Sequence, residues 1–259
     1  MNKNIIDDLV SLLCECGMLY HSDFQRIRDG LNPETSIDQA IDEHLQLQLP
    51  KIFKASYLSE ETIWIKPRVE DWCWIVDPVD GTENLIAGSP NVATSVALIN
   101  PGGECVLGAI HAPLLKETFS GVRGAGAFLN GEHLTGNGNI SRNILSMAFP
   151  CRGPAISDLI GGQVASLLRN SWTIRASGSA ALDICNVARG RWSAFFEEST
   201  YSWDIAAASL IAEEAGCFVS TATSKHYGDD PHVRGYLVAA TRQLHSQLEL
   251  ILKGNNVDC

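Results

Sequence analysis

The chain has 259 residues, of which 45% are hydrophobic and 19% charged, and its formal net charge is -11. This composition excludes disorder, collagen and coiled coil as the main architecture, and it is typical of one large or two closely packed globular domains. The acidic surplus argues against a nucleic-acid partner. No apolar stretch approaches the roughly 20 residues of a membrane span, and the N-terminus has no apolar signal core. We therefore expect a cytoplasmic protein with no membrane partner.

The cysteines and histidines follow no metal-binding pattern. None of the eight cysteines forms a CxxC pair, and most of them stand in apolar stretches. We interpret them as reduced, buried thiols rather than as disulfides or zinc ligands. The seven histidines also lack ligand spacing, so we interpret them as surface or packing residues.

Two helices are predicted at the start of the chain. Apolar residues recur there at three- and four-residue steps, which indicates an amphipathic helix over residues 4–19. A break at residues 29–33 follows, and Thr35 or Ser36 can then cap a second helix. Asp38 falls in the first turn of that second helix.

The middle of the chain predicts a sheet. Short apolar or β-branched stretches alternate with the turn signals Pro101-Gly102-Gly103 and Asn130-Gly131. Because these turns are short, the pattern favours an antiparallel meander. The predicted strands cover residues 72–76, 92–99, 105–110 and 117–121.

After about residue 142 the pattern changes to alternating helix and strand. Layers of sheet and helix in both parts of the chain predict an α+β fold. We expect an N-terminal half over 1–145 and a C-terminal half over 146–259, packed as one compact unit. In the second half the predicted helices cover 179–189, 204–215 and 243–252, and the predicted strands cover 192–196 and 236–241.

The most informative segment is the acidic turn Asp77-Pro78-Val79-Asp80-Gly81-Thr82. Two carboxylates about 5 Å apart repel by roughly 3 kcal/mol at an effective dielectric near 20, so a partly buried pair needs a cation. Residues 69–115 and 192–224 contain no Lys or Arg. A hard divalent metal such as Mg2+ fits this all-oxygen set of ligands. The alternative is a solvated turn in which an Asp caps a helix.

The same turn also suggests an anion site. Gly81 and Thr82 can begin a short helix, whose first backbone amides would point at a phosphate beside the metal. A haloacid-dehalogenase-like phosphatase is a rival interpretation. That chemistry needs an acid two residues after the nucleophile, where this chain has Val79, so the rival is disfavoured.

Three separated motifs occur in the order found in a known family. They are Ser59-Glu60-Glu61, the segment DPVDGTENL at 77–85, and Trp203-Asp204 followed by IAAA. Through them the sequence resembles the inositol monophosphatase family of Mg2+-dependent, lithium-sensitive phosphatases. The resemblance implies a layered αβαβα sandwich, of the type shared with fructose-1,6-bisphosphatase, and a homodimer.

The resemblance also implies the metal ligands and the catalytic residues. Glu60, Asp77 and the Val79 carbonyl would hold one Mg2+, and Asp77, Asp80 and Asp204 a second. Glu60 would also reach a third, weaker Mg2+. The side chains of Asp38 and Thr82 would position the attacking water, and the backbone amides of Gly81 and Thr82 would hold the phosphate. On the substrate side the implied contacts are Asp80, Ala180 and Glu197, with neighbouring Glu198 as the alternative to Glu197.

The function implied is hydrolysis of a small polyol phosphate, most simply inositol monophosphate, by in-line attack of metal-activated water. Histidinol phosphate, fructose 1,6-bisphosphate and a nucleotide 3'-phosphate remain as alternative substrates. A different class of function is a regulatory binding protein that keeps the fold without the chemistry.

Overall fold

The computed structural model describes residues 3–28, 37–62, 71–136, 143–149, 154–222, 227 and 232–253. The predicted break at 29–33 and the predicted caps Thr35 and Ser36 lie outside these residues.

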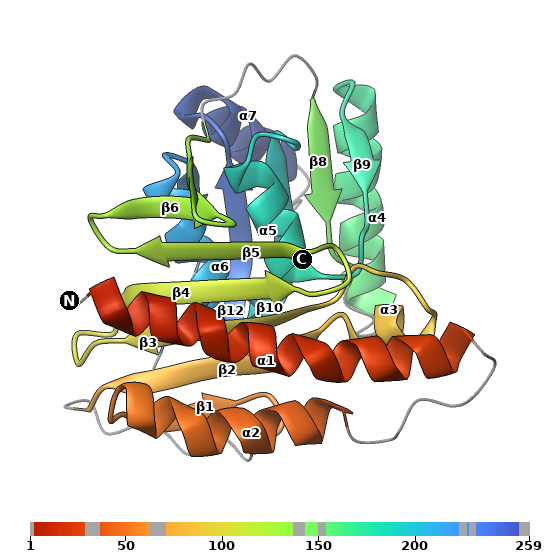
Figure 1. Ribbon diagram of the computed structural model, residues 1–259. Helices are drawn as coiled ribbons and strands as arrows, with labels where there is room; N and C mark the ends of the chain where they lie inside the picture. The colour runs from red at the N-terminus through yellow and green to blue at the C-terminus, as the bar shows by residue number, and fades with distance from the viewer. Residues whose placement is uncertain are drawn as a thin grey trace.

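Two long helices cover one face of the first sheet. Helix α1 spans Lys3–Arg28 and α2 spans Ile37–Ile52, so α1 extends well past the predicted end at residue 19. Figure 1 shows them side by side, in red and orange. Their buried apolar residues, such as Leu13 and Ile41, pack in one cluster with Trp74 and other residues of the sheet. This one-sided burial is what the three- and four-residue apolar spacing predicts.

Within the described residues, the first sheet has seven strands in chain order. Strand β1 is parallel to β2, and every later pair is antiparallel. The predicted meander is therefore confirmed. The strands are β1 (Ser56–Ser59), β2 (Cys73–Asp80), β3 (Ala93–Ile99), β4 (Cys105–Ala112), β5 (Glu117–Val122), β6 (Gly126–Leu129) and β7 (Glu132–Leu134).

In the part of the chain that the structure describes, the second sheet has five strands in the order β11-β12-β10-β8-β9, so its strands do not follow chain order. Strand β10 lies inside it, antiparallel to β12 and parallel to β8. The strands are β8 (Ile144–Met147), β9 (Thr173–Arg175), β10 (Ala194–Tyr201), β11 (Phe218–Ser220) and β12 (His232–Ala239).

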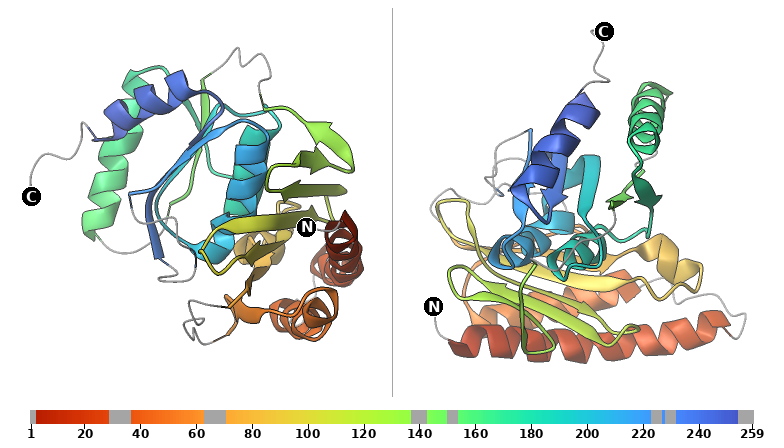
Figure 2. Two further views of the ribbon diagram at one scale, coloured as in Figure 1. Left: turned by 90° about the vertical axis from the view of Figure 1, so that its left-hand side faces the viewer. Right: turned by 90° about the horizontal axis from the view of Figure 1, so that it is seen from above.

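The remaining long helices complete five layers. Helices α5 (Ala180–Ala188) and α6 (Ser202–Glu214) lie between the two sheets. Helices α4 (Pro154–Arg169) and α7 (Arg242–Lys253) cover the outer face of the second sheet. Figure 2 shows the resulting order of helices, sheet, helices, sheet and helices. The predicted αβαβα sandwich is confirmed, whereas a division near residue 145 stays a prediction.

Helix α6 is apolar on nearly all sides because it packs between two sheets. It also approaches the first sheet closely: a Cβ added at Gly108 of β4 would meet the Ala207 Cα at 2.9 Å. Helix α6 is therefore fixed against the meander, and this fixes the position of its first turn. None of the helices in the described part of the chain is long and apolar enough to cross a membrane.

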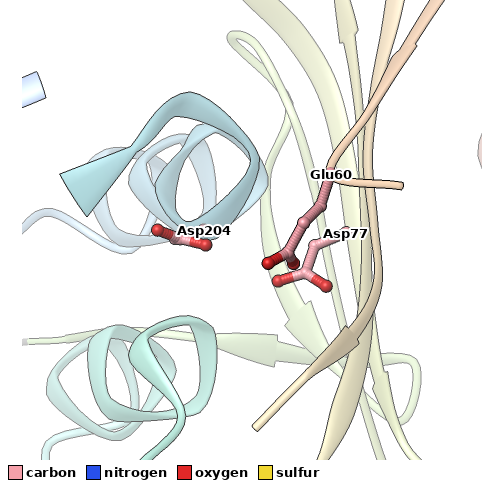
Figure 3. Close-up of side chains that lie close together, drawn as sticks. All are labelled: Glu60, Asp77 and Asp204. Carbon is pink, nitrogen blue, oxygen red and sulfur yellow. The ribbon is translucent and has the colours of Figure 1, made fainter. Parts of the chain in front are cut away.

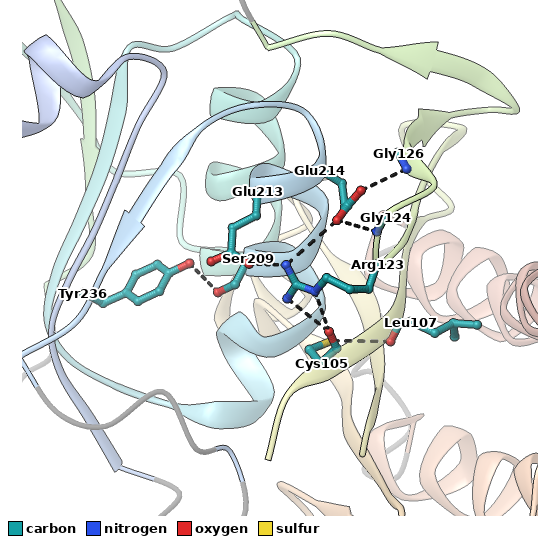
Figure 4. A network of polar contacts seen from close by, with 9 residues as sticks. All are labelled: Cys105, Leu107, Arg123, Gly124, Gly126, Ser209, Glu213, Glu214 and Tyr236. Atoms are coloured by element: carbon teal, nitrogen blue, oxygen red, sulfur yellow. Dashed lines mark hydrogen bonds and ion pairs between the residues drawn. The ribbon is translucent and has the colours of Figure 1, made fainter. Parts of the chain in front are cut away.

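A polar network fastens the other end of α6 (Figure 4). Glu213 accepts a hydrogen bond at 2.7 Å from Arg123, which follows β5. The Glu214 carboxylate accepts hydrogen bonds from the backbone amides of Gly124 and Gly126 at 2.9 and 3.0 Å. Both glutamates thus hold the turn between β5 and β6, and neither belongs to the close group of acidic residues described below.

Strand β10 is longer than its sequence suggests. The prediction ended it at Phe196, but the strand continues through Glu197 and Glu198 to Tyr201. These polar residues give no apolar pattern, yet β12 pairs with them as far as Tyr201. Pairing to a neighbouring strand, which no local pattern reveals, decided the end of β10.

Candidate active site

Three carboxylates from distant parts of the chain meet between the first sheet and α6 (Figure 3). One oxygen from each of Glu60, Asp77 and Asp204 lies within 4.8 Å of the other two. Asp77 belongs to β2, and Glu60 directly follows β1, the strand parallel to β2. The Glu60 backbone amide donates a hydrogen bond to the Val76 carbonyl at 3.2 Å. Asp204 stands in the first turn of α6.

Asp77 is the buried centre of this group, with 1% of its surface exposed. Its Oδ1 is buried without a hydrogen-bond partner among the described residues. Burial raises the pKa of Asp77 well above its usual value, and the charges of Asp80, Glu60 and Asp204 raise it further. A buried, unpartnered carboxylate oxygen beside other carboxylates is the environment that a bound divalent cation satisfies. The donor set therefore fits Mg2+.

Two other carboxyl groups of the site are also perturbed. Glu60 is exposed at its surface, but desolvation of its carboxylate, followed by the charge of Asp204, raises its pKa to about 7. The same two causes raise the pKa of Asp80 to about 7. Among the described residues Asp80 is not part of the close group of three, but its charge raises the pKa of Asp77. Protons and a metal ion would therefore compete for these groups.

Hydrogen bonds from the start of α5 orient the Asp80 carboxylate. Its Oδ2 accepts the Ser179 hydroxyl at 2.5 Å and the Ala181 amide at 2.8 Å. Ala180, the predicted substrate contact, is the first residue of α5 and stands between these two donors. The structure thus places Asp80 and Ala180 together, as the proposed substrate contacts require.

Asp204 is oriented by its own helix start. Its Oδ2 accepts the Thr200 hydroxyl at 2.8 Å and the Tyr201 amide at 2.9 Å, so the carboxylate also caps α6. Trp203 stacks on Tyr201 with ring centroids 4.6 Å apart. This contact gives Trp203 a packing role directly beside Asp204.

The predicted water-positioning pair is in contact. The Thr82 hydroxyl lies 3.2 Å from Asp38 Oδ1 and 3.0 Å from the Val79 carbonyl oxygen, both acceptors. Burial raises the pKa of Asp38. Thr82 therefore joins the start of α2 to the turn that carries the predicted carbonyl ligand.

The predicted short helix is present as α3 (Thr82–Ile86), which begins directly after Gly81. Gly81 has φ 93°, and a Cβ there would meet the Asn91 carbonyl oxygen at 2.7 Å. Only glycine fits this turn without strain. The turn places the backbone of Gly81 and Thr82, the predicted phosphate contacts, immediately after the carboxylates of the acidic turn.

The two neighbouring glutamates of β10 lie on opposite faces of the second sheet. Glu197 is 8% exposed and shares the inner face with Phe195, which packs in the cluster of α5 and α6. Glu198 accepts a hydrogen bond at 2.8 Å from Gln163 of the outer helix α4. Glu197 therefore lies on the inner face of the sheet, whereas Glu198 lies on the outer face.

Sequence reasoning missed the residues whose side chains hold the backbone of the site in place through hydrogen bonds. The hydroxyls of Tyr20 and Thr94 both donate to the Pro78 carbonyl, at 2.7 and 2.8 Å. Asn84, which belongs to the predicted motif, donates to the Ser177 carbonyl at 2.8 Å. These contacts join distant segments, and no local pattern at Tyr20 or Thr94 indicates them.

Comparisons with known proteins identify the family. The model of the inositol monophosphatase family matches residues 20–253. The chain is 31% identical to "Nus factor SuhB" of Pasteurella multocida over 83% of this chain and 80% of that protein. It is 35% identical to "Inositol monophosphatase" of Dictyostelium discoideum over 70% of this chain and 69% of that protein.

Solved structures share the fold. The suhB protein of Bartonella henselae superposes with a TM-score of 0.82 at 26% identity, covering 97% of this chain and 99% of that chain. An IMPase of Thermotoga maritima superposes with a TM-score of 0.80 at 27% identity, covering 96% of both chains. By its sequence, and by a fold that assembles the acidic site, this chain belongs to the inositol monophosphatase family.

Proposed function

We propose that the chain is a Mg2+-dependent phosphomonoesterase that hydrolyses a small polyol phosphate, with inositol monophosphate as the leading substrate. Family membership supports a phosphatase, and the family is generally Mg2+-dependent. The observation that carries the proposal is the group of Glu60, Asp77 and Asp204, with a buried oxygen on Asp77 that has no hydrogen-bond partner among the described residues.

The metal would be held by the carboxylates of Glu60, Asp77, Asp80 and Asp204 and by the Val79 carbonyl. Two ions, with a third bound more weakly at Glu60, would offset these charges and those of the phosphate. When bound, Mg2+ would neutralise the phosphate oxygens and supply an activated water. The orienting bonds to Asp80 and Asp204 support this assignment.

The chain's own residues would place the substrate. The amides of Gly81 and Thr82 would donate to the phosphate oxygens, and the Thr82 hydroxyl with Asp38 would orient the attacking water. The backbone at Ala180 and the carboxylates of Asp80 and Glu197 would contact substrate hydroxyls. Support comes from the contact between Thr82 and Asp38 and from the position of Glu197 on the inner face.

The test is phosphate release from myo-inositol 1-phosphate, histidinol phosphate, fructose 1,6-bisphosphate and adenosine 3',5'-bisphosphate, with Mg2+ or with EDTA. We expect release that depends on Mg2+ and is lost in Asp77→Asn. Glu117→Gln is the control, because this carboxylate pairs with Arg189 at 2.6 Å and takes no part in the proposed site. The absence of release from every ester by folded, Mg2+-loaded protein would refute the proposal.

A second candidate function is regulatory binding, alone or beside catalysis. It is favoured by one observation, since relatives at 31% to 34% identity carry the name "Nus factor SuhB". A partner that is retained equally by wild type and by Asp77→Asn would support a binding role that is independent of the metal. The homodimer implied by the family resemblance is also a proposal, and sedimentation velocity of the purified chain would test it.

A further inference from the structure

A buried carboxylate that is not one of the proposed metal ligands lies near the start of α5, next to the residues that orient Asp80. Asp183, in the first turn of α5, is 2% exposed. Its two oxygens accept the hydroxyls of two serines, Ser146 of β8 and Ser177 of the segment between β9 and α5. The carboxylate thus joins the second sheet to the segment that precedes α5.

These hydrogen bonds do not serve to cap the helix. Ser179 is the N-cap of α5, and its hydroxyl oxygen already accepts the Leu182 amide at 3.3 Å. The Asp183 side chain instead reaches back to Ser177. Burying a carboxylate is costly unless its oxygens are hydrogen-bonded, so this pair of serine donors makes the buried position tolerable.

The segment that Asp183 holds is the one that orients Asp80. The Ser179 amide lies 3.4 Å from the Ser177 hydroxyl oxygen, and the Ser179 hydroxyl donates to Asp80 Oδ2. On the other side, Asn84 of α3 donates to the Ser177 carbonyl at 2.8 Å. Residues 177–181, which we call the substrate loop, are therefore held by Asp183 and by Asn84.

We infer that Asp183 is a positioning residue, which fixes the substrate loop so that Ser179 and Ala181 keep the Asp80 carboxylate in the orientation that binds metal and substrate. This inference rests on the proposed function for the role of Asp80. Asp183 itself touches neither metal nor substrate. It acts through Ser177, and its loss loosens the loop without removing any ligand.

The test compares Asp183→Ala and Asp183→Asn with wild type. Loss of a residue that supports a metal ligand typically costs 10- to 100-fold in metal affinity or activity. For Asp183→Ala we expect a Mg2+ dissociation constant, measured by calorimetry, and a KM for the phosphate ester that each rise about tenfold. The amide of Asp183→Asn can still accept a hydrogen bond from one serine hydroxyl and donate one to the other. We therefore expect its Mg2+ dissociation constant and its KM to lie close to the wild-type values. Amide hydrogen exchange over 177–182 should accelerate in Asp183→Ala.

Glu214→Gln and Glu214→Ala are the matched controls. Glu214 also accepts two hydrogen bonds, but the turn that it holds, between β5 and β6, is not part of the substrate loop. They should lower the melting temperature without changing the Mg2+ dissociation constant or KM. Asp183→Ala that folds with wild-type Mg2+ affinity and wild-type exchange would overturn the inference. If Asp183→Ala does not fold, Ser177→Ala replaces it, and wild-type Mg2+ affinity in that variant would also overturn it.

These outcomes separate the inference from the proposed function. A wild-type chain that binds Mg2+ and releases no phosphate from any ester refutes the phosphatase. The Mg2+ dissociation constant and the exchange rate of the substrate loop would still decide the role of Asp183.

Discussion

The Tyr20 hydroxyl of α1 donates a hydrogen bond at 2.7 Å to the Pro78 carbonyl, between the two aspartates of the acidic turn. Tyr20 is fully buried. Thr94 of β3 donates to the same oxygen, so two distant elements hold one carbonyl of the turn. The pairing of β2 with β3 is irregular between Asp77 and Asp80, and these hydroxyls stabilise the turn where the regular pairing is interrupted.

Tyr20→Phe should therefore weaken the site as well as the fold. We expect the free energy of unfolding to fall by about 1 kcal/mol and the Mg2+ dissociation constant to rise, because the turn gains freedom. Chemical denaturation and calorimetry measure the two effects. Tyr236→Phe is the control, since Tyr236 is equally buried and its hydroxyl contacts Ser209 at 2.6 Å, away from the turn. Equal Mg2+ affinities in the two variants would contradict this role of Tyr20.

Asp77→Asn should stabilise the metal-free protein. The substitution replaces a buried carboxyl group, whose ionisation burial and the charges of Asp80, Glu60 and Asp204 disfavour, with a neutral amide. Relief of about 1 kcal/mol of repulsion would raise the melting temperature in EDTA by about 3 °C. The same variant should gain no further stability from Mg2+, whereas wild type should. A melting temperature in EDTA that is lower for Asp77→Asn than for wild type would contradict the expected repulsion between Asp77 and its neighbouring carboxylates.

The stability of the metal-free protein should fall as the pH rises. Folding raises the pKa of Glu60 and Asp80 to about 7 and that of Asp183 to about 6, whereas unfolded carboxyl groups titrate near 4. The stabilisation from these groups is thus complete below about pH 4 and is lost as the pH rises toward 7. In EDTA we expect a lower melting temperature at pH 8 than at pH 5.5.

Mg2+ should reverse this trend, because it binds the ionised carboxylates. Thermal unfolding at both pH values, with and without Mg2+, measures the effect. A melting temperature in EDTA that rises between pH 5.5 and pH 8 would contradict the raised pKa values.

Thr82→Ala should separate catalysis from metal binding. The variant loses the hydroxyl that contacts Asp38 and the Val79 carbonyl, but it keeps the backbone and every carboxylate. We expect kcat to fall about 100-fold, the lower range for loss of a positioned proton-transfer group, with a smaller change in the Mg2+ dissociation constant because every carboxylate is kept. Thr82→Ser, which keeps the hydroxyl, should retain most of the activity. Equal loss in both variants would rule out a role for the hydroxyl.

Glu197→Gln and Glu198→Gln form a matched pair for substrate recognition. They are neighbours on β10, but only Glu197 lies on the inner face. Loss of one hydrogen bond to a charged group costs about 1.5 kcal/mol, so we expect Glu197→Gln to raise KM for the polyol phosphate about tenfold. KM for p-nitrophenyl phosphate, which has no such hydroxyls, should not change. An equal effect of both variants on the polyol phosphate would contradict the assignment.

The local elements could be predicted because their signals are short-range. The apolar spacing of α1 and α2 and the turns of the meander depend only on residues a few positions apart. The acidic turn at 77–82 likewise shows its two carboxylates and its glycine within a single hexapeptide. From these features the sequence predicted an α+β fold and a metal site at the acidic turn, whereas the αβαβα layering was implied by the resemblance to the family.

Only the tertiary structure decided which distant groups meet. The contacts of Tyr20 with Pro78 and of Asp183 with Ser146 and Ser177 join separate elements. The choice between Glu197 and Glu198 depended on the extension of β10 along β12. A side-chain hydrogen bond requires two atoms within about 3 Å, and for residues far apart in the chain this depends on packing between layers. The sequence by itself determined which carboxylates are available and their local spacing, whereas the packing of α1, α5 and α6 against the sheets determined how those side chains are oriented.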